Sequence, residues 1–310
     1  MPSTGPAPGP PAVDTPRAGT ALDARRLVRA ARLVHPFPSL LDGGVVALIA
    51  IVAGGGPAKA VVLGLSMACL QFAIGAANDL VDAAADAGRK PGKPIPDGVV
   101  TVGHARLVVA AAAGAGFLLA LAASPGLLVL ALVGFGIGLA YDVWAKGTAL
   151  SWLPFAVGIP LLPLYGWYGA TGEVPGMFLV IVPAAATAGT GLAIANAIVD
   201  MERDRDAGVR SIALALGPSR ASRLVLVLHL VVAVLAVGTA AILGAPAGWV
   251  VAVLASCAVP VGGGALGIVG AGRDGSGLRE LAWEVQAMGT GLLAVAWLGA
   301  LSASQGATGA

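Results

Sequence analysis

The sequence predicts an all-α, polytopic membrane protein with about nine transmembrane helices. Of its 310 residues, 57% are hydrophobic and only 11% are charged, and the mean hydropathy is +0.89. These values are too apolar for a soluble domain of this length. The apolar residues are also gathered into stretches long enough to cross a hydrocarbon layer of about 30 Å. The chain is therefore expected to lie in a lipid bilayer.

Nine such stretches follow one another along the chain. Pro, Gly or charged residues separate each stretch from the next, because these residues end helices or avoid hydrocarbon. The shortest separation is the Ser124-Pro125-Gly126 turn between the third and fourth stretches. The predicted spans are 39–56, 60–78, 104–123, 125–141, 150–170, 175–197, 223–243, 245–270 and 280–302.

The spans form one transmembrane domain, residues 25–310, after a tail of residues 1–24. The tail is rich in Pro, Ala, Gly and Thr and lacks the basic-then-apolar order of a signal peptide, so we expect it to be disordered. Alternation of nine spans places every Lys and Arg except Lys59 on one side. Because cytoplasmic loops are enriched in these residues, that side is expected to face the cytoplasm.

The charge pattern also excludes one class of function. The net charge is only +2, and the basic residues are spread over the loops rather than gathered with aromatic residues in one patch. Nucleic-acid binding therefore has no support. Arg is much more frequent than Lys, and Ala and Gly abound, which is typical of a GC-rich bacterial source. The expected location is the bacterial plasma membrane.

Two polar stripes stand out where long apolar runs end, after the second and sixth predicted spans. In each stripe an Asn is followed by two Asp at the spacing i, i+4, i+8, which on an α-helix places three side chains along one face over about 12 Å. Both stripes fall on the same predicted side of the membrane, where they would surround a shared space with oxygen atoms. They are Asn78, Asp82 and Asp86, and Asn196, Asp200 and Asp204.

Carboxylate oxygens in this arrangement suit Mg²⁺, which binds one or two carboxylates together with the phosphates of a substrate. A loop rich in Pro and Gly follows the first stripe and carries Arg89, Lys90 and Lys93, and Arg210 follows the second stripe. Such cations can contact the outer oxygens of a diphosphate. The residues thus indicate an enzyme that acts on a phosphate ester. For either stripe alone, the alternative interpretation is a solvated helix end followed by loop cations.

The sequence resembles the UbiA family of integral-membrane prenyltransferases, whose two aspartate-rich motifs are similar to the runs Asn78-Asp79-x-x-Asp82-x-x-x-Asp86 and Asp200-x-x-x-Asp204. The resemblance covers most of the chain, including the nine-span layout, the basic segment 25–32 and the segment from Tyr141 to Lys146. It implies an all-helical bundle around a central, lipid-accessible cavity that binds Mg²⁺ and an isoprenyl diphosphate. One departure is Lys93, where many members have Arg before the following Pro.

By position, the resemblance implies a role for each polar residue of the motifs. The expected metal ligands are Asn78, Asp79, Asp82, Asp86, Asn196, Asp200 and Asp204. Four of these acids, Asp82, Asp86, Asp200 and Asp204, are expected to be catalytic. The expected substrate contacts are Asn78, Asn196, Arg89, Lys93, Tyr141, Lys146 and Arg210.

Three polar residues inside the predicted spans are weighed separately, because a charge at bilayer depth normally faces a cavity or a partner. Asp42 in the first span is expected to contact an acceptor or to orient a motif, with an interfacial cap as the alternative. Gln71 lies seven residues before Asn78, on nearly the same helix face, and is expected deeper in the same cavity, as a contact of the acceptor. His229 is expected to be a hydrogen-bonded packing residue rather than a base.

The resemblance implies Mg²⁺-dependent transfer of a prenyl group from an isoprenyl diphosphate to an acceptor within the membrane. The acceptor is expected to be hydrophobic, and aromatic or a quinone precursor. A membrane terpene cyclase, or a phosphoribosyl or lipid transferase of the same fold, is the alternative within the family. A transporter that binds an ion at the stripes is the alternative outside it. The sequence leaves the prenyl length and the oligomeric state open.

Overall fold

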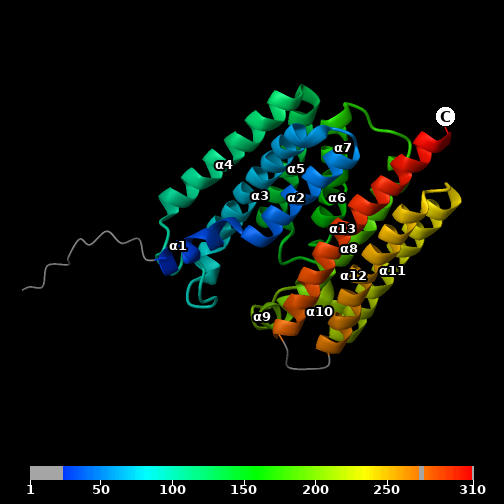
Figure 1. Ribbon diagram of the computed structural model, residues 1–310. Coiled ribbons are helices and arrows are strands. Elements are labelled where there is room, and N and C mark those ends of the chain that lie inside the picture. The colour runs from blue at the N-terminus through cyan, green and yellow to red at the C-terminus, as the bar shows by residue number, and fades with distance from the viewer. Residues whose placement is uncertain (1–23, 272–275, 309–310) are drawn as a thin grey trace, which may run out of the picture.

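The computed structural model describes residues 24–271 and 276–308. Every regular element in these two ranges is a helix, and the helices form one bundle (Figure 1). The predicted all-α class is therefore confirmed. The predicted tail, residues 1–24, lies outside the described residues except for Ala24, with which the first helix begins.

The helices follow one another with short connections, apart from the loop between α3 and α4. In chain order they are α1 (Ala24–Ala31), the 3₁₀ turn η1 (Arg32–Val34), α2 (Pro36–Val52), α3 (Gly56–Asp86), α4 (Val102–Ala123), α5 (Pro125–Ala140), the π-helical turn η2 (Tyr141–Ala145), α6 (Leu153–Gly158), α7 (Leu161–Thr171), α8 (Phe178–Val199), α9 (Met201–Asp206), α10 (Ile212–Leu216), α11 (Pro218–Ile242), α12 (Ala247–Ala271) and α13 (Ser276–Thr308).

Eight of the nine predicted spans correspond to single long helices. Seven helices of the described ranges are long and apolar enough to cross a membrane: α3, α4, α5 with η2, α8, α11, α12 and α13. The first predicted span is α2, which meets the segment Arg25–Val34 at an angle of 57° and counts as an eighth span together with it. The bend lies at His35, which has a φ of 46° and precedes Pro36. Pro disfavours helical backbone in the residue before it, so the chain turns there.

The fifth predicted span, 150–170, is not one helix. Its residues form α6, which ends at Gly158, and α7, which begins at Leu161. Pro160 lies in the break. Because Pro has no backbone N–H and its ring clashes with the preceding turn, an α-helix does not continue through it without a kink or a break. The break leaves Phe155 and Ile159 in the walls of the cavities described below.

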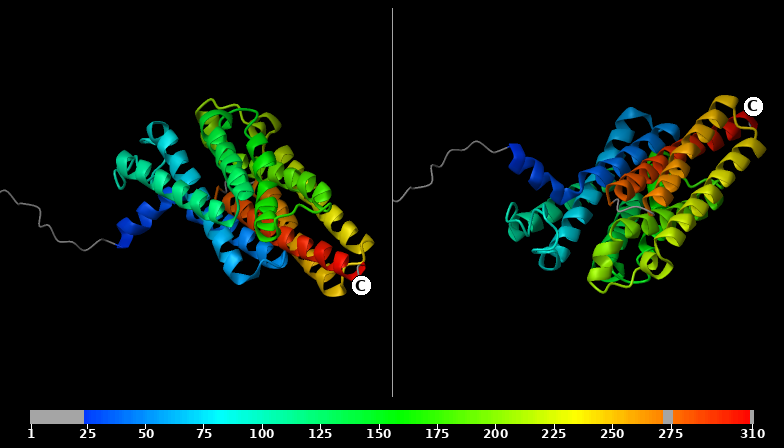
Figure 2. Two further views of the ribbon diagram at one scale, coloured as in Figure 1. Left: turned by 90° about the horizontal axis from the view of Figure 1, so that it is seen from above. Right: turned by 90° about the horizontal axis from the view of Figure 1, so that it is seen from below.

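The helices of the bundle form two halves, which lie beside each other in Figures 1 and 2. In the first half α2 packs on α3, α3 on α4 and α4 on α5, and in the second half α8, α11, α12 and α13 pack together. Contacts of α13 with α2 and of α8 with α6 join the halves. The first polar stripe lies at the end of a helix of the first half, and the second stripe at the end of a helix of the second half.

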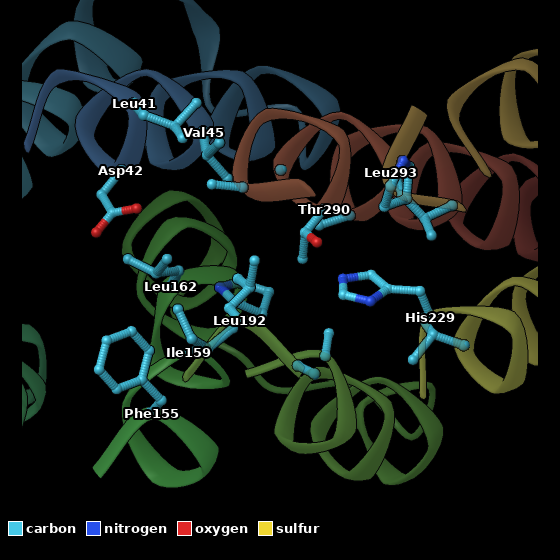
Figure 3. Close-up of a pocket in the computed structure, with 18 of the residues that line it drawn as sticks. Leu41, Asp42, Val45, Phe155, Ile159, Leu162, Leu192, His229, Thr290 and Leu293 are labelled. Carbon is cyan, nitrogen blue, oxygen red and sulfur yellow. The ribbon is translucent and has the colours of Figure 1, made fainter. Parts of the chain in front are cut away.

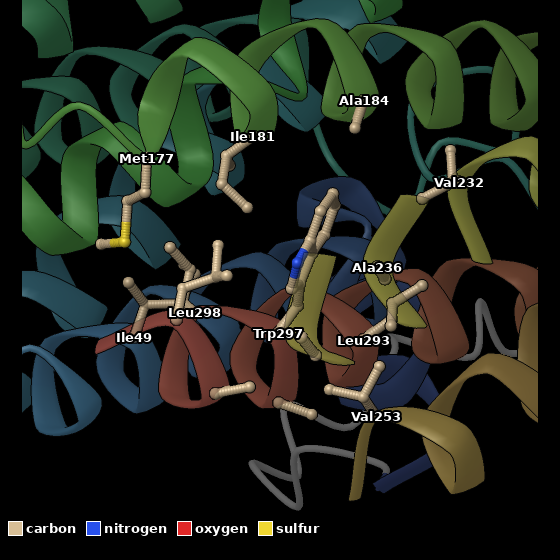
Figure 4. Packing of buried hydrophobic residues seen from close by; sticks show 14 of the residues in the cluster. Ile49, Met177, Ile181, Ala184, Val232, Ala236, Val253, Leu293, Trp297 and Leu298 are labelled. Carbon is tan, nitrogen blue, oxygen red and sulfur yellow. The ribbon is translucent and has the colours of Figure 1, made fainter. Parts of the chain in front are cut away.

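Small residues allow a close helix crossing between α2 and α3. A Cβ added to Gly43 would lie 2.8 Å from the carbonyl oxygen of Gly64, and a Cβ added to Gly64 would lie 2.8 Å from that of Gly43. Close approach through small residues is typical of helix pairs in membranes. The second half packs instead around larger side chains, among them Trp297, Ile181 and Leu298 (Figure 4).

Candidate active site

A cavity of about 380 Å³ lies between the two halves, and we call it the main cavity. Its walls come from α2, α3, α5, η2, α6, α7, the end of α8 and Trp283 of α13. Polar and charged side chains line one end, and apolar side chains such as Met67, Leu70 and Phe135 line the rest. A cavity with one charged end and one apolar end fits a molecule that is itself polar at one end.

The first stripe lies on α3, which continues as a helix to Asp86, as the Ala-rich sequence favours. Asn78 and Asp82 line the main cavity. Asp86 does not line it, and its carboxylate lies 3.4 Å from Lys90 Nζ and 3.9 Å from Lys93 Nζ. The predicted stripe is thus present as a helical face, and its two inner members reach the cavity.

Asp79 is one residue away from this face and contacts a different set of side chains. Its Oδ1 accepts hydrogen bonds from His35 Nε2 at 2.9 Å and from Lys93 Nζ at 2.6 Å, while its Oδ2 is buried without a hydrogen-bond partner. Asp79 is not among the residues that line the main cavity. Its contacts hold the loop after α3 and the bend at His35 against the helix. The predicted role of Asp79 as a metal ligand has no geometric support here.

The second stripe is not a single helical line, contrary to the expectation from its spacing. Helix α8 ends at Val199, and Asp200 has φ −91° and ψ 2°, outside the α-helical region. Asp204 therefore belongs to the separate helix α9, whose first turn is closed by a hydrogen bond from Asp204 N to Asp200 O at 2.9 Å. The break arises at a residue in the bridge region of backbone space, where many active-site residues lie. Asn196 and Asp200 line the main cavity, opposite Asn78 and Asp82.

Asp204 lies beside the cavity rather than in its wall. Partial burial, and then the charge of Asp200, raise the pKa of the Asp204 carboxyl above its ordinary value, while Lys90 and Arg203 act in the opposite direction. Lys90 and Asp200 line the same cavity, so the loop after the first stripe approaches the second stripe. Asp200 itself pairs with Arg203. The two stripes thus converge on one region of the molecule.

The π-helical turn η2 brings three side chains to the same end of the cavity. The hydrogen bond from Lys146 N to Tyr141 O, at 2.9 Å, closes a wider turn than that of an α-helix. Such π-turns occur frequently at functional sites. Tyr141, Asp142 and Lys146 all line the main cavity, and Lys146 pairs with Asp82. Asp142 accepts a hydrogen bond at 2.6 Å from the Nδ2 of Asn78.

Asp142 is the main residue that sequence reasoning missed. It is buried, it lies between the two predicted residues Tyr141 and Lys146, and it contacts the first stripe directly. An acid within an otherwise apolar span end was the available signal. Phe155 and Trp283 also line the cavity and were not among the predicted site residues, whereas Lys90, which lines it too, was among the loop cations expected near a diphosphate. Phe155 lies on α6, shortly before the break, and Trp283 lies on the distant helix α13. No local spacing in the sequence therefore indicated either residue.

The other predicted contacts divide into two groups. Asp42 and Gln71 line the main cavity at its apolar end, where the Nε2 of Gln71 donates a hydrogen bond to the Oδ2 of Asp42 at 2.7 Å. Lys93 lines the polar end. Arg89 and Arg210 are exposed and do not belong to the cavity wall.

The polar end has the donor chemistry for Mg²⁺. In the described part of the chain no three His, Cys, Asp or Glu side chains are grouped closely enough to hold a metal ion by themselves. Mg²⁺ does not require such a cage, because it usually keeps several waters and takes one or two carboxylates together with substrate phosphates. Asp82 and Asp200, with the amide oxygens of Asn78 and Asn196, supply hard oxygen ligands of this kind. The residues present therefore fit the ion.

Comparisons with known proteins agree with this geometry. The sequence profile of the UbiA prenyltransferase family matches residues 43–269. A UbiA homolog from Archaeoglobus fulgidus bound to GPP and Mg²⁺ superposes with a TM-score of 0.67 at 20% identity, covering 89% of this chain and 99% of that chain. A UbiA homolog from Aeropyrum pernix K1, solved in the apo state, gives a TM-score of 0.62 at 20% identity, covering 88% and 98%. Comparison with curated protein sequences gives no match.

The structural likeness, at these identities, concerns the fold alone, and the family profile provides the assignment. The profile begins in α2 and ends in α12, so it contains both stripes, the π-turn and the break in α6 and α7. The membrane spans and the cavity between the two helical halves agree with the architecture that the resemblance to this family implied. The chain belongs to the UbiA prenyltransferase family and is an integral-membrane enzyme of that family.

Proposed function

We propose that this enzyme transfers a prenyl group from an isoprenyl diphosphate to an acceptor within the membrane, in a reaction that requires Mg²⁺. One observation carries the proposal. Asn78 and Asp82 from one half and Asn196 and Asp200 from the other line the polar end of a single cavity, and the wall away from this end is largely apolar. Homologs of this fold have been solved bound to GPP and Mg²⁺ and to DMAPP and Mg²⁺.

The positive charges at the polar end of the main cavity suit the diphosphate group of a substrate better than they suit a substrate carboxylate. Lys90, Lys93 and Lys146 line the cavity among the acids and can donate to phosphate oxygens. Mg²⁺, when bound, would stabilise the negative charge that develops on the departing diphosphate. Asp82, Asp200, Asn78 and Asn196 would hold the ion, and the lysines would contact the oxygens that face away from it.

The proposed reaction breaks the bond between the allylic carbon and the diphosphate oxygen, and the electron pair leaves with the diphosphate. The allylic carbon then bonds to a nucleophilic atom of the acceptor, which loses a proton. The apolar wall excludes water, which would otherwise capture the carbon centre. Tyr141, Phe155 and Trp283 line the same cavity, and their aromatic faces would stabilise a developing cation.

The orientation in the membrane is also part of the proposal. We infer that the polar end faces the cytoplasm of a bacterium, because the alternation of nine spans places every Lys and Arg except Lys59 on the side of the stripes. Lys59 lies at the opposite end of α3, where its Nζ donates a hydrogen bond to Ala170 O at 2.8 Å. Labelling of single introduced cysteines in intact cells tests this orientation.

The principal test measures diphosphate release by the purified full chain in lipid nanodiscs supplied with DMAPP or GPP and Mg²⁺. We expect release to stop with a chelator, and to fall at least about a hundredfold in Asp82→Ala and in Asp200→Ala, since each removes a carboxylate that would hold the Mg²⁺ on which the leaving group depends. Asp206→Ala, at an exposed acid on α9, is the matched control and should keep wild-type release. Near-native turnover in a correctly inserted Asp82→Ala or Asp200→Ala would count decisively against the proposal.

Product analysis separates transfer from its alternatives. Labelled prenyl diphosphate with an aromatic acceptor should give a prenylated product, whereas a cyclase gives a cyclic terpene without any acceptor. A transporter would move a solute across liposomes and leave the prenyl diphosphate intact. No structural observation favours either alternative over transfer.

A further inference from the structure

A second cavity of about 140 Å³ adjoins the main cavity, and we call it the side cavity (Figure 3). It lies among α2, α6, α7, α8, α11, α12 and α13, so it belongs largely to the second half of the bundle. Asp42, Phe155 and Trp283 line both cavities and mark the passage between them. The side cavity therefore opens toward the place where the allylic carbon would lie.

Two polar side chains that line this mostly apolar space have a polar atom without a hydrogen-bond partner. His229 of α11 is only 2% exposed, and its Nε2 has no hydrogen-bond partner. The Oγ1 of Thr290 on α13 is also buried without a partner. Figure 3 shows the imidazole of His229 and the hydroxyl of Thr290 pointing into the same space from two adjoining walls. Buried polar groups are normally satisfied, so two orphans that face one cavity indicate a missing ligand group.

The tautomer of His229 follows from its other nitrogen. Nδ1 lies 2.9 Å from the carbonyl oxygen of Val225, and because a carbonyl only accepts, Nδ1 carries the hydrogen. The neutral ring then presents Nε2 as an acceptor. Its position is fixed from the side as well, because a Cβ on Gly191 would lie 3.0 Å from His229 Cε1. The hydrogen bond of Nδ1 accounts for the expected packing role of His229 and uses one of its two ring nitrogens. The other nitrogen, Nε2, needs a hydrogen-bond donor.

The size and the charge of the side cavity restrict the class of ligand that can bind there. Its volume is close to the about 150 Å³ of an apolar cavity that binds benzene, so one six-membered ring fits. None of the described residues that line it is Lys or Arg. A carboxylate would therefore be buried without a counter-charge, at a cost that excludes it. An uncharged ring with a hydroxyl group satisfies both the shape and the orphan acceptor.

We propose that the side cavity is the acceptor subsite and takes an uncharged, hydroxyl-bearing ring of the phenol class. The hydroxyl donates to His229 Nε2 and accepts from Thr290 Oγ1, and the opposite edge of the ring faces Asp42 and the main cavity. As an acceptor subsite, the assignment rests on the proposed prenyl transfer. As a binding site for a phenol, it depends only on the cavity and its two polar groups.

The test uses two probes of nearly the same shape, 4-bromophenol and 4-bromotoluene, with the full chain in nanodiscs. Bromine quenches tryptophan fluorescence, and Trp283 and Trp297 both line the side cavity. The quantity compared is the preference, the Kd of 4-bromotoluene divided by that of 4-bromophenol. We expect His229→Leu and Thr290→Val each to lower this preference about tenfold, the worth of a hydrogen bond to a buried polar group.

Two further variants serve as controls. His229→Gln keeps an acceptor near the position of Nε2 and should retain most of the preference. Thr190→Val removes a hydroxyl of α8 that already bonds to Ala186 O at 2.9 Å and does not line the cavity, so it should retain all of it. The preference of the wild type needs no variant and stays measurable if a substitution unfolds the protein.

The outcomes separate this inference from the proposed function. An equal preference in wild type and His229→Leu means that the orphans bind only water, and it overturns the subsite. If this occurs while the wild type still cleaves prenyl diphosphate, the enzyme function stands and the acceptor lies elsewhere. If the wild type prefers the phenol through His229 but cleaves no prenyl diphosphate, the proposed function fails and the phenol site remains. A raised KM for a phenol acceptor in Thr290→Val supports both.

Discussion

Replacement of Asp142 separates a structural from a functional role for the π-turn. The carboxylate is buried, one of its oxygens accepts the 2.6 Å hydrogen bond from Asn78, and the other has no partner. A bond to a charged acceptor contributes about 1.5–3 kcal/mol, which corresponds to roughly 10- to 150-fold in an equilibrium constant. Since this bond turns the Nδ2 of Asn78 toward Asp142, it leaves the amide oxygen of Asn78 available to the cavity.

Asp142→Leu should therefore raise the Mg²⁺ concentration for half-maximal diphosphate release by about 10- to 100-fold, the range typical of residues that orient a metal ligand. Asp142→Asn keeps a neutral acceptor and should give a smaller increase, because charge-assisted hydrogen bonds are about twice as strong as neutral ones. The assay is a Mg²⁺ titration of release in nanodiscs, with Asp206→Asn as the exposed control.

Thermal unfolding provides the second measurement. If the acid mainly supported the fold, its loss would lower Tm. We expect Tm to change little, since removal of a buried carboxylate with one unpaired oxygen also removes a desolvation cost. An unchanged Mg²⁺ requirement in a folded Asp142→Leu protein would refute the orienting role.

Three further predictions concern other contacts. Lys146→Met should raise the KM for the prenyl diphosphate about tenfold in steady-state assays while Arg220→Met, at an exposed position of α11, leaves it unchanged; equal KM values would remove Lys146 from the site. Gly43→Ala should cost about 1–3 kcal/mol of stability, because its Cβ meets the carbonyl of Gly64, whereas Gly44→Ala meets nothing within 4 Å and should be tolerated in the same melting experiment. Ser66→Ala should lower the free energy of unfolding by about 1–3 kcal/mol, because the buried hydroxyl of Tyr165, 2.6 Å away, loses its hydrogen-bond partner. Tyr165→Phe should lower it less, because Ser66 keeps its 2.7 Å hydrogen bond to Gly116 O. The opposite order of the two variants would contradict this account.

The sequence indicated the helices well because their apolar composition determines them directly. The two exceptions have local causes that hydropathy does not report. Pro160 divides the fifth predicted span, and Asp200 leaves helical backbone so that its stripe bends. Both deviations lie at the main cavity, where Phe155 and Asp200 form part of the wall. Regular spacing predicted the neighbourhood of the site, and departures from regularity shape it.

The stripes were predictable from spacing, but their partners were not. Spacing along a helix indicates which side chains share a face, and it does not tell which lysine from another element will approach. The Lys146–Asp82 and Lys93–Asp79 pairs join residues whose proximity depends on the π-turn and on the loop after α3. The role of Asp142 and the orphaned nitrogen of His229 likewise depend on tertiary packing.

These ion pairs lead to a last prediction. Three acids of the stripes face a cation, Asp82 with Lys146, Asp86 with Lys90 and Asp200 with Arg203, and so does the neighbouring Asp79 with Lys93. An unpaired charge near hydrocarbon is costly. The lysines therefore neutralise the acids before a substrate arrives and become available to phosphate oxygens once the acids hold a cation.

If the lysines change partners in this way, Asp82→Ala has two effects: it removes a metal ligand, and it leaves Lys146 without its partner. The pair is partly buried, with side-chain exposures of 30% for Lys146 and 16% for Asp82, so its coupling should lie between that of surface and buried pairs, at about 1–2 kcal/mol. The double variant Asp82→Ala with Lys146→Met should then be more stable than Asp82→Ala alone and remain inactive. A melting experiment on the four proteins of this cycle gives the coupling directly. Additive changes in stability would show that Lys146 does not depend on Asp82, and the exchange of partners would have to be abandoned.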